Sequence, residues 1–267
     1  MTGGADVSRT QMRHQAIIAA VRKQGYASHE ELARHFDVAV QTIRRDIRIL
    51  DAAGDVVRHH GGASAPSSVE NIAYSQRQIH TRREKEAIGA SAARAVPDGA
   101  SLFINIGTTT EAFARALSGH RGLQVITNNL HVASLLAGGA DCRVVVTGGT
   151  VRMRDGGILG PDSLEMLARY RADYGVIGIS GIDGDGTLLD YDQEEIRASE
   201  LIRANSRKVF LLADHTKFGR RPLVRAGSIV GVDVFFTDRR PPEPICDLLA
   251  EHGVELVIAD MNVRKRT

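Results

Sequence analysis

The sequence predicts an α/β domain with a Rossmann-like, mostly parallel sheet, preceded by a small winged helix-turn-helix module. Three observations carry this prediction. Residues 40–50 combine an apolar stripe at helical spacing with three arginines. Small and polar residues gather at 63–68, which indicates a boundary. From Ala100 onward, apolar runs of strand length alternate with helix-like segments.

The segment at 40–50 has the features of a helix that enters the major groove of DNA. Its apolar stripe consists of Val40, Ile43, Ile47 and Leu50. Arginine pairs with phosphate or forks onto guanine, and glutamine or threonine contacts base edges. A solvated helix face with no ligand is the alternative for such a segment in isolation. The side chains that we expect to contact DNA here are Gln41, Thr42, Arg44, Arg45 and Arg48.

The neighbouring segments favour DNA binding over a plain surface helix. Residues 13–23 carry apolar residues at helical spacing and predict a first helix. Ser28 and Glu31 match a capping box, which starts a second helix. A short connection at 37–39 then leads into the arginine-bearing segment. Three helices, the last two joined by a tight turn, make a helix-turn-helix.

The residues after this helix predict a wing. Residues 56–62 begin as a strand and end in a glycine pair, which places Arg58, His59 and His60 near the sugar-phosphate backbone. An ordinary solvent-facing hairpin is the alternative. Residues 1–65 hold nine Lys and Arg against seven Asp and Glu, an excess equal to the +2 of the whole chain. With so small an excess, DNA affinity would depend on where the charges lie and on oligomer avidity.

The composition is that of a globular protein without a cofactor motif. Of 267 residues, 43% are hydrophobic and 25% are charged. No apolar run approaches the roughly 18 residues of a membrane span, and the N-terminus has no signal-peptide character, so we expect a cytoplasmic protein. Cys142 and Cys246 each lie in an apolar context, which predicts two buried thiols instead of a disulfide. The histidines and cysteines lack metal-ligand spacing, so no metal or other cofactor is expected.

The predicted division of the chain has four parts. Residues 9–65 form the DNA-binding domain, 66–95 a linker and connector helix, 96–260 the α/β domain and 261–267 a basic tail. Within the connector, residues 74–95 are highly charged and helix-like, and we expect this helix to dock on the larger domain. A phosphate-binding role for its arginines is the alternative.

The α/β domain is predicted from its alternating segments. The predicted strands are 101–106, 124–127, 143–147, 174–179, 208–213, 232–237 and 255–258. The predicted helices are 111–117, 130–137, 163–171, 194–206 and 244–251. Continuous apolar strands that alternate with helices indicate a parallel sheet covered on both faces. Ligands of such sheets bind beyond the carboxyl ends of the strands.

The first strand end has the features of a phosphate cradle. Gly107, Thr108, Thr109 and Thr110 follow the strand and precede a helix. Glycine allows backbone N–H groups to approach an anion, hydroxyls are further donors, and a helix N-terminus carries roughly half a positive charge. A threonine N-cap with two uninvolved neighbours is the alternative. The segment lacks the lysine and spacing of a Walker A loop, which argues against ATP hydrolysis.

The other predicted strand ends add polar or glycine-rich segments at the same edge. Asn128 and Asn129 follow the second strand, and their amides can bond sugar hydroxyls as donors or acceptors. Asp214 and Lys217 follow the fifth strand, where Lys217 is the obvious cation for a phosphate. Glycine-rich segments follow the third and fourth strands. Together these ends fit a small phosphorylated polyol or sugar.

These motifs resemble those of the DeoR family of transcriptional regulators. Residues 28–62 are similar to the DeoR-type winged helix. The second domain looks like the family's sugar-phosphate sensor, whose fold is related to phosphosugar isomerases. The segments that carry the likeness are 30–33, 41–46, 58–63, 102–109, 154–158, 178–183 and 214–220. The resemblance covers roughly residues 9–258.

The resemblance implies a repressor without enzymatic activity that binds operator DNA as a homo-oligomer, either a dimer or a tetramer. A phosphorylated polyol or sugar would release it, with glycerol 3-phosphate the favoured effector. Carried over by motif, Gly107, Thr108 and Thr109 would hold the phosphate. The residues that would complete the pocket are Asn128, Asn129, Asp214 and Lys217.

Three residues depart from the family pattern. Ala39 replaces the serine usual before the recognition helix, and Val40 replaces a common proline. Loss of an N-cap hydroxyl costs about 1 kcal/mol. Asn105 replaces the usual aspartate on the first strand, which weakens any acid role at that position.

Two alternatives to the repressor stay open in the sequence. One is a phosphosugar isomerase-like enzyme with an appended DNA-binding module, which needs a positioned acid/base pair. The candidates are Glu194 or Glu195 with Asp214 or Lys217. The other is an activator, because the sign of regulation depends on where the operator lies relative to the promoter.

Overall fold

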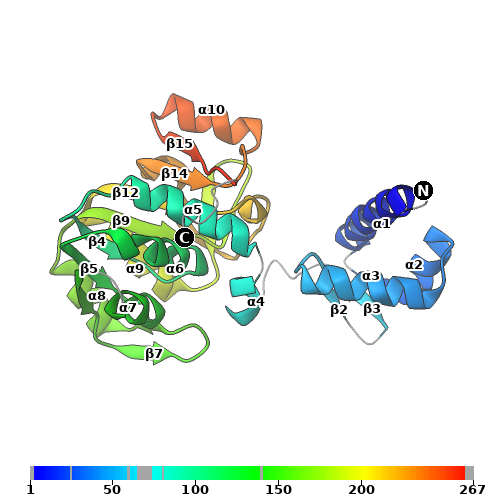
Figure 1. Ribbon diagram of the computed structural model, residues 1–267, viewed down its shortest axis with the longest axis horizontal. Coiled ribbons are helices and arrows are strands. Elements are labelled where there is room, and N and C mark those ends of the chain that lie inside the picture. The colour runs from blue at the N-terminus through cyan, green and yellow to red at the C-terminus, as the bar shows by residue number, and fades with distance from the viewer. Residues whose placement is uncertain are drawn as a thin grey trace. The chain divides into compact units, whose positions relative to one another are not determined.

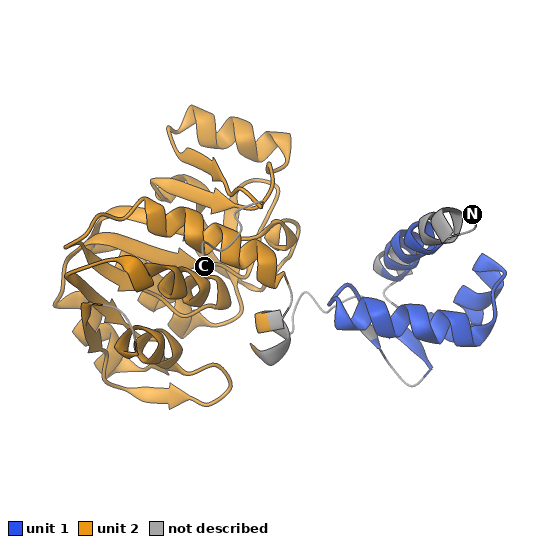
Figure 2. Ribbon diagram, viewed as in Figure 1, with its two compact units in different colours: residues 1–71 blue, residues 72–267 orange. Residues whose placement is uncertain are grey.

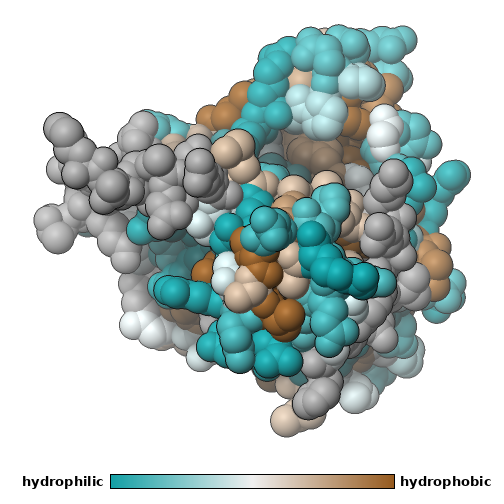
Figure 3. Space-filling model, turned by 90° about the vertical axis from the view of Figure 1, so that its right-hand side faces the viewer, coloured by the Kyte–Doolittle hydropathy of each residue, from teal (hydrophilic) through white to brown (hydrophobic). Residues whose placement is uncertain are grey.

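The chain folds into two compact units, residues 1–71 and 72–267 (Figure 2). The boundary falls within the predicted linker and connector at 66–95. The structure, a computed structural model, describes residues 3–24, 26–58, 61–64, 74–79, 81–138 and 141–261. Among these residues, no helix has the length and apolar character that crossing a membrane requires. Hydrophilic side chains, teal in Figure 3, occupy much of the face drawn there, with apolar groups between them.

The N-terminal unit is a winged helix-turn-helix, as the sequence predicts (Figure 1). Its helices are α1 (Gly3–Gln24), α2 (His29–Phe36) and α3 (Val40–Ala52). Its strands are β1 (Tyr26–Ser28), β2 (Val57–Arg58) and β3 (Gly62–Ser64). They form an antiparallel sheet in the order β1-β3-β2. The first helix begins at Gly3, before the predicted start at 13, because the apolar spacing that predicts it begins only at Ile17.

The apolar stripe of α3 is the centre of this unit's core. Ile43 and Ile47 are fully buried and Leu50 is nearly so, whereas Val40 is only partly buried. The residues of α1 and α2 in the same core are Ile17, Ile18, Val21, Leu32 and Ala33. Full burial of one such aliphatic side chain contributes about 1.5–3 kcal/mol. Because this stripe packs inward, most of the polar side chains of α3 face solvent, with the exception of the buried Asp46.

Local signals start α2 and α3 as predicted. The Ser28 hydroxyl accepts a hydrogen bond from the Glu31 N–H at 3.1 Å, and the Glu31 carboxylate accepts one from the Ser28 N–H at 2.9 Å. The predicted capping box is therefore present. The turn between the helices passes through Asp37 at φ 49°, a left-handed conformation that aspartate tolerates. Helix α3 follows Ala39 without a side-chain cap, as the missing serine predicts.

The second unit is built on a seven-stranded sheet in the order β15-β14-β12-β9-β4-β5-β6. Its strands are β4 (Ser101–Ile104), β5 (Leu123–Thr127), β6 (Cys142–Val146), β9 (Ala172–Gly178), β12 (Ser206–Leu212), β14 (Val234–Thr237) and β15 (Glu255–Ile258). Every neighbouring pair is parallel. The seven predicted strands and their parallel arrangement are confirmed. The chain runs outward from β4 through β5 to β6, and later places β9 on the other side of β4.

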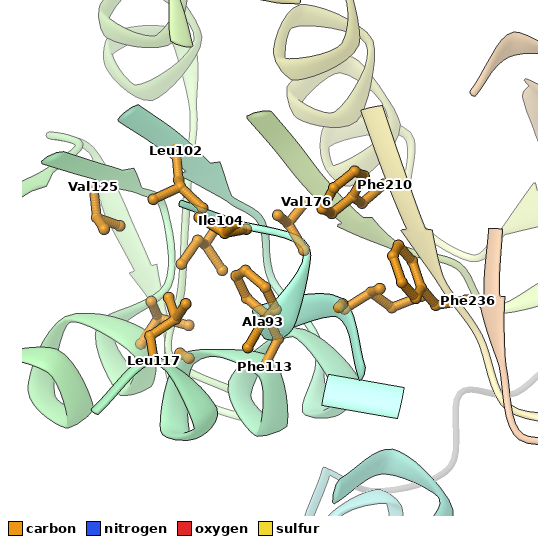
Figure 4. Close-up of a cluster of buried hydrophobic side chains, with 14 of the residues drawn as sticks. Ala93, Leu102, Ile104, Phe113, Leu117, Val125, Val176, Phe210 and Phe236 are labelled. Carbon is orange, nitrogen blue, oxygen red and sulfur yellow. The ribbon is translucent and has the colours of Figure 1, made fainter. Parts of the chain in front are cut away.

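Helices cover both faces of this sheet (Figure 1). One face packs against α5 (Arg82–Arg94), α6 (Thr108–Ala116) and α7 (Leu130–Ala137). The other packs against α8 (Pro161–Ala168), α9 (Gln193–Ala204) and α10 (Glu243–Glu251). In the first core, Phe113 of α6 and Ala93 of α5 lie opposite Ile104 and its neighbours on the sheet (Figure 4). Phe103 alternates with these residues along β4 and faces the second core.

A glycine lets α5 approach α6 closely. A Cβ at position 89 would lie 2.5 Å from the backbone nitrogen of Phe113, so only Gly89 permits this packing. The contact fixes the position of α6. The N-terminus of α6 is the predicted phosphate cradle.

The sequence missed the short antiparallel strands. They form a hairpin of β7 (Thr150–Arg152) and β8 (Gly157–Leu159), and a small sheet of β10 (Gly181–Ile182), β11 (Thr187–Asp190) and β13 (Val224–Ser228). Single 3-10 turns are η1 (Leu117–Gly119), η2 (His215–Lys217) and η3 (Ile229–Gly231). Such short elements carry too little periodicity to be predicted from spacing.

Two sequence predictions were wrong in part. The connector is not one helix over 74–95, because α4 (Tyr74–Ile79) is separate from α5, and Thr81 precedes α5 at φ 50°. A residue in that left-handed region cannot continue a helix. Cys142 is only partly buried, since β6 is an edge strand, while Cys246 is buried and both thiols are free. The basic tail from residue 262 lies outside the described residues.

Candidate functional site

Helix α3 presents most of its polar residues to solvent. The exposed ones are Gln41, Arg44, Arg45 and Arg48, and Thr42 is half-buried. They share the helix with Ile43 and Ile47, which face the core. The outward surface of α3 therefore carries three guanidinium groups, a hydroxyl and an amide. These are the groups that contact phosphates and base edges in a major groove.

The wing adds Arg58, which is exposed in β2. Its N–H donates to the Asp51 carboxylate at 2.9 Å, so the start of the wing is tied to the end of α3. Arg58 pairs with Ala63 across the antiparallel β2 and β3. The predicted contact residues His59 and His60 lie outside the described residues.

A buried ion pair fixes α3 against α1. Asp46 is 3% exposed, and its carboxylate accepts a hydrogen bond from Arg13 Nε at 2.7 Å. His14 Nε2 lies 3.0 Å from the other carboxylate oxygen. Burial raises the pKa of Asp46, but the hydrogen bonds from Arg13 and His14 outweigh it, so the pKa is lowered. This ion pair links α3 to α1 within the unit.

A pocket lies in the second unit at the carboxyl ends of β4 and β9. These strands are neighbours, and the chain leaves them toward opposite edges of the sheet. Loops that diverge from adjacent strands leave a crevice, which is where open α/β sheets bind ligands. The lining residues are Arg77, Asn105, Ile106, Gly107, Thr108, Thr109, Gly178, Ile179, Ser180, Asp190, Glu195, Ser199 and Lys217.

The predicted phosphate cradle forms one wall of this pocket. Gly107 makes the turn from β4 into α6 at φ 151°, a conformation that favours glycine. Thr108 and Thr109 follow in the first turn of α6, whose N–H groups lack acceptors within the helix. Such a terminus favours an anion. Thr110 does not line the pocket, because its hydroxyl lies 2.8 Å from the carbonyl oxygens of Asn105 and Gly107 and braces the turn.

Lys217, the cation that the sequence places at this edge, lines the pocket. Burial lowers its pKa to about 7, and Arg220 acts in the same direction. Asp214 is not a lining residue; its carboxylate accepts hydrogen bonds from the Thr216 N–H at 3.0 Å and the Thr81 hydroxyl at 3.2 Å. Burial opposes its ionisation, but Lys217 and Thr216 lower the Asp214 pKa to about 2. Asp214 therefore supports the lysine-bearing turn as a fixed negative charge.

A further wall of the pocket is acidic. Asp190 and Glu195 line it, and burial raises the pKa of both carboxyl groups. Arg152 forms an ion pair with Glu195 and another with Asp192 at 2.5 Å. It also donates to the buried Asp155 at 2.9 Å. This network joins the β7–β8 hairpin to α9 beside the pocket.

Three asparagines near the strand ends have different roles. Asn105 lines the pocket, and its Nδ2 donates to the Ser199 hydroxyl at 2.6 Å. Asn129 caps α7, where its Oδ1 accepts from the His131 N–H at 2.9 Å. Asn128 is fully buried, and neither polar atom of its side chain has a hydrogen-bond partner among the described residues. Neither Asn128 nor Asn129 is among the described lining residues.

The enzyme alternative needs an acid/base pair in the pocket, and only some of its candidate residues lie there. Glu195 and Lys217 line the pocket, whereas Glu194 and Asp214 do not. Glu195 is already bound by Arg152. Within the described residues, no group of His, Cys, Asp and Glu has the makeup of a metal site.

The sequence assigned no pocket role to Asp190 or Ser199, and it offered phosphate binding by connector arginines such as Arg77 only as an alternative to docking. All three side chains line the pocket. Asp190 belongs to β11, Ser199 to α9 and Arg77 to α4, three elements that are distant in sequence from one another or from the cradle. Apolar spacing predicts which residues pack in a core, and it carries no signal for a polar side chain that faces a pocket.

The chain combines an arginine-bearing helix in a winged unit with a pocket suited to an anion. These two features define a class of protein, the DNA-binding regulators that carry their own ligand-binding domain. Two family descriptions match the chain in the same order. The DeoR-like helix-turn-helix domain matches residues 13–69, and the DeoR C terminal sensor domain matches residues 80–239. The chain therefore belongs to the DeoR family, as its motifs predict.

Relatives with assigned names match both units. The glycerol-3-phosphate regulon repressor of Escherichia coli (strain K12) is 47% identical, over 91% of this chain and 97% of that protein. The protein of the same name from Haemophilus influenzae is 46% identical, over 95% of this chain and 98% of its own. Among solved structures, ribose 5-phosphate isomerase A from Neisseria gonorrhoeae is 17% identical, covers 51% of this chain and 53% of its own, and has a TM-score of 0.36.

Proposed function

We propose that the protein is a transcriptional repressor that leaves its operator when a small phosphorylated polyol or sugar, foremost glycerol 3-phosphate, occupies the pocket at β4 and β9. The observation that carries this proposal is the cradle of Gly107, Thr108 and Thr109 at a sheet crevice, in a chain whose other unit exposes an arginine-bearing helix. The two relatives named as glycerol-3-phosphate regulon repressors support it. Because its target is operator DNA, we expect it to act in the cytoplasm.

On the DNA side, we expect base contacts from α3 and backbone contacts from the wing. The residues proposed for these contacts are Gln41, Thr42, Arg44, Arg45, Arg48, Arg58, His59 and His60. The N-terminal unit has little excess charge, so a homo-oligomer would supply affinity through avidity. Two recognition helices of such an oligomer would meet half-sites about one helical turn of DNA apart.

On the effector side, we expect Gly107, Thr108 and Thr109 to hold the phosphate through N–H groups and hydroxyls, with Lys217 supplying charge. The other predicted ligand residues are buried outside the lining and would shape the pocket from behind. They are Thr110, Asn128, Asn129 and Asp214. Effector binding would then shift the placement of the DNA-binding units in the oligomer, so that half-site spacing no longer matches. A coupling of about 1–3 kcal/mol is typical of such regulation.

The direct test is fluorescence anisotropy of the full-length protein on DNA from its own promoter region, at fixed salt, titrated with glycerol 3-phosphate. Release by glycerol 3-phosphate, with no effect of glycerol or inorganic phosphate, is the expected result. Specific binding without release would make the effector another phosphorylated sugar. Absence of specific DNA binding, together with turnover of phosphosugars, would replace the repressor by the enzyme alternative.

A further inference from the structure

Helix α4 has an unusual position in the chain. It is a six-residue helix at the start of the second unit. It also lies between residues 13–69 and 80–239, which match the two family domains. One of its side chains, Arg77, nevertheless lines the pocket. Helix α4 is therefore close in sequence to the DNA-binding unit and close in space to the cradle.

Tyr74 fastens α4 to α6. Its hydroxyl donates to the Glu111 carboxylate and lies 2.9 Å from both oxygens. The Tyr74 ring stacks on His131, with ring centroids 5.0 Å apart and an interplanar angle of 9°. Burial and the Glu111 carboxylate raise the pKa of Tyr74, so the hydroxyl keeps its proton as a donor. Glu111 is 1% exposed and directly follows Thr110, so α4 is tied to the first turns of the cradle helix.

Arg77 lies three residues further along, on the same face of α4 as Tyr74. Its guanidinium carbon is 5.9 Å from the Tyr74 ring centroid, and its Nη2 is 3.4 Å from the Asp155 carboxylate. Lys85 Nζ donates to the Arg77 carbonyl oxygen and holds the backbone there. The Nε of Arg77 is buried and has no hydrogen-bond partner within the described chain. A buried donor is costly to leave unpaired, and a phosphate oxygen is a strong acceptor for it.

The charges around Arg77 favour an anion in the pocket. Arg77 and Lys217 both line it, and the positive charge of Arg77 is among the causes that lower the pKa of Lys217. Bound phosphate would relieve this repulsion, since it places a negative charge within reach of both groups. Burial raises the pKa of the nearby carboxyl groups of Asp190 and Glu195, which opposes negative charge there, and Arg152 acts against this shift at Glu195.

We propose that Arg77 binds the phosphate of the effector through its Nε–H, which makes α4 part of the occupied pocket. This inference rests on the proposed function. The contact between Arg77 and Asp155 is long, so phosphate would compete with Asp155 for the guanidinium group. Occupancy of the pocket would then act on α4, the described helix of this unit that is nearest in sequence to the DNA-binding unit. A polyol without phosphate would leave Arg77 unengaged.

The test compares Arg77→Gln with Arg82→Gln in the full-length protein. Arg82 is a matched control, because its side chain is 73% exposed, pairs with Glu86 on the surface of α5, and does not line the pocket. We expect Arg77→Gln to weaken glycerol 3-phosphate binding in calorimetry by about tenfold or more. Operator affinity without effector should stay within about twofold of wild type for both variants. Arg77→Lys keeps the charge but loses the planar fork, and should fall between wild type and Arg77→Gln.

Thr108→Ala separates failure of this inference from failure of the proposed function. If Thr108→Ala weakens glycerol 3-phosphate binding while Arg77→Gln does not, Arg77 is not a phosphate ligand and the proposed function stands. If wild type binds neither glycerol 3-phosphate nor any other phosphorylated polyol or sugar, both fail. An equal loss of binding in Arg82→Gln would also overturn the inference, because the effect would then not be specific to the pocket.

Discussion

The two units hold their functional charges in opposite ways. In the DNA-binding unit the arginines of α3 are exposed along one continuous helix. In the sensor unit (residues 72–267) the charged side chains that line the pocket are buried or half-buried, and one of them, Glu195, is paired with Arg152. Dissolved salt screens the attraction between exposed charges and a ligand. The interaction of buried charges with a ligand depends instead on their geometry and on their shifted pKa values. DNA binding should therefore respond mainly to salt, and effector binding mainly to pH and to single side chains.

Removal of one α3 arginine should give the largest change. If Arg45 contacts a base, Arg45→Ala should weaken operator binding by about 1–3 kcal/mol, roughly 5- to 150-fold, with effector binding unchanged. Anisotropy on operator DNA measures the first quantity and calorimetry with glycerol 3-phosphate the second. Arg82→Ala, which removes an exposed arginine of α5, is the control. An unchanged operator affinity in Arg45→Ala would count against α3 as the recognition helix.

The pH dependence of effector binding should be the next largest effect. The pKa of Lys217 is lowered to about 7 by burial and by Arg220. A phosphate dianion favours the charged ammonium, so binding raises this pKa and takes up a proton. Affinity should fall as the pH rises above about 7, by at most about tenfold per unit. Ionisation of Asp190 and Glu195 would act in the same direction, because negative charge repels phosphate.

Lys217→Arg provides the control for this pH dependence. Arginine stays charged throughout the range, so calorimetry of this variant between about pH 7 and 8.5 should show a flatter profile than wild type. Operator binding without effector should show the same pH dependence in both proteins. A slope that is equally steep in Lys217→Arg would rule out Lys217 as the titrating group.

Loss of one cradle hydroxyl should have a smaller effect. Thr108→Ala removes a donor but keeps the backbone N–H groups of the α6 terminus, so effector affinity should fall by about 0.5–1.5 kcal/mol, roughly three- to tenfold. Calorimetry with glycerol 3-phosphate measures this change. Thr150→Ala, in the exposed β7, should leave affinity unchanged. Full effector affinity in Thr108→Ala would remove this hydroxyl from the site.

The smallest expected effects concern helix caps in the DNA-binding unit. Ser28→Ala breaks the capping box and should cost about 1 kcal/mol, which lowers the melting temperature of this unit by roughly 4–8 °C. Ala39→Ser adds the missing cap of α3 and should raise the melting temperature by a similar or smaller amount. Thermal unfolding followed by circular dichroism measures both changes. Equal melting temperatures of wild type and Ser28→Ala would contradict the capping argument.

Local patterns predicted the parts of the fold that depend on neighbours in sequence. The stripe of α3 and the capping box at Ser28 are set within a few residues, and both were predicted. The seven strands of the sheet were predicted because continuous apolar runs are needed to fill a core on each face. The strand-to-helix turn at Gly107–Thr109 was also predicted, and phosphate binding there stays a prediction.

Partners distant in sequence could not be predicted. Asp46 is buried because of Arg13, which is 33 residues away, and Arg77 meets the cradle only through the packing of α4 on α6. Residue type alone also left the role of one asparagine open. An asparagine after a strand suits a sugar hydroxyl and a helix N-cap equally, and the structure uses Asn129 as a cap.

The central claim is that one chain couples an outward DNA surface to a buried effector pocket. Coupling is reciprocal, so an effector that weakens operator binding by a given factor must itself bind more weakly, by that factor, when operator is present. We would measure the affinity for glycerol 3-phosphate by calorimetry with and without saturating operator DNA. The account predicts a loss of affinity on DNA of roughly 5- to 150-fold, equal to the loss seen in the DNA titration. The same affinity with and without operator would contradict it.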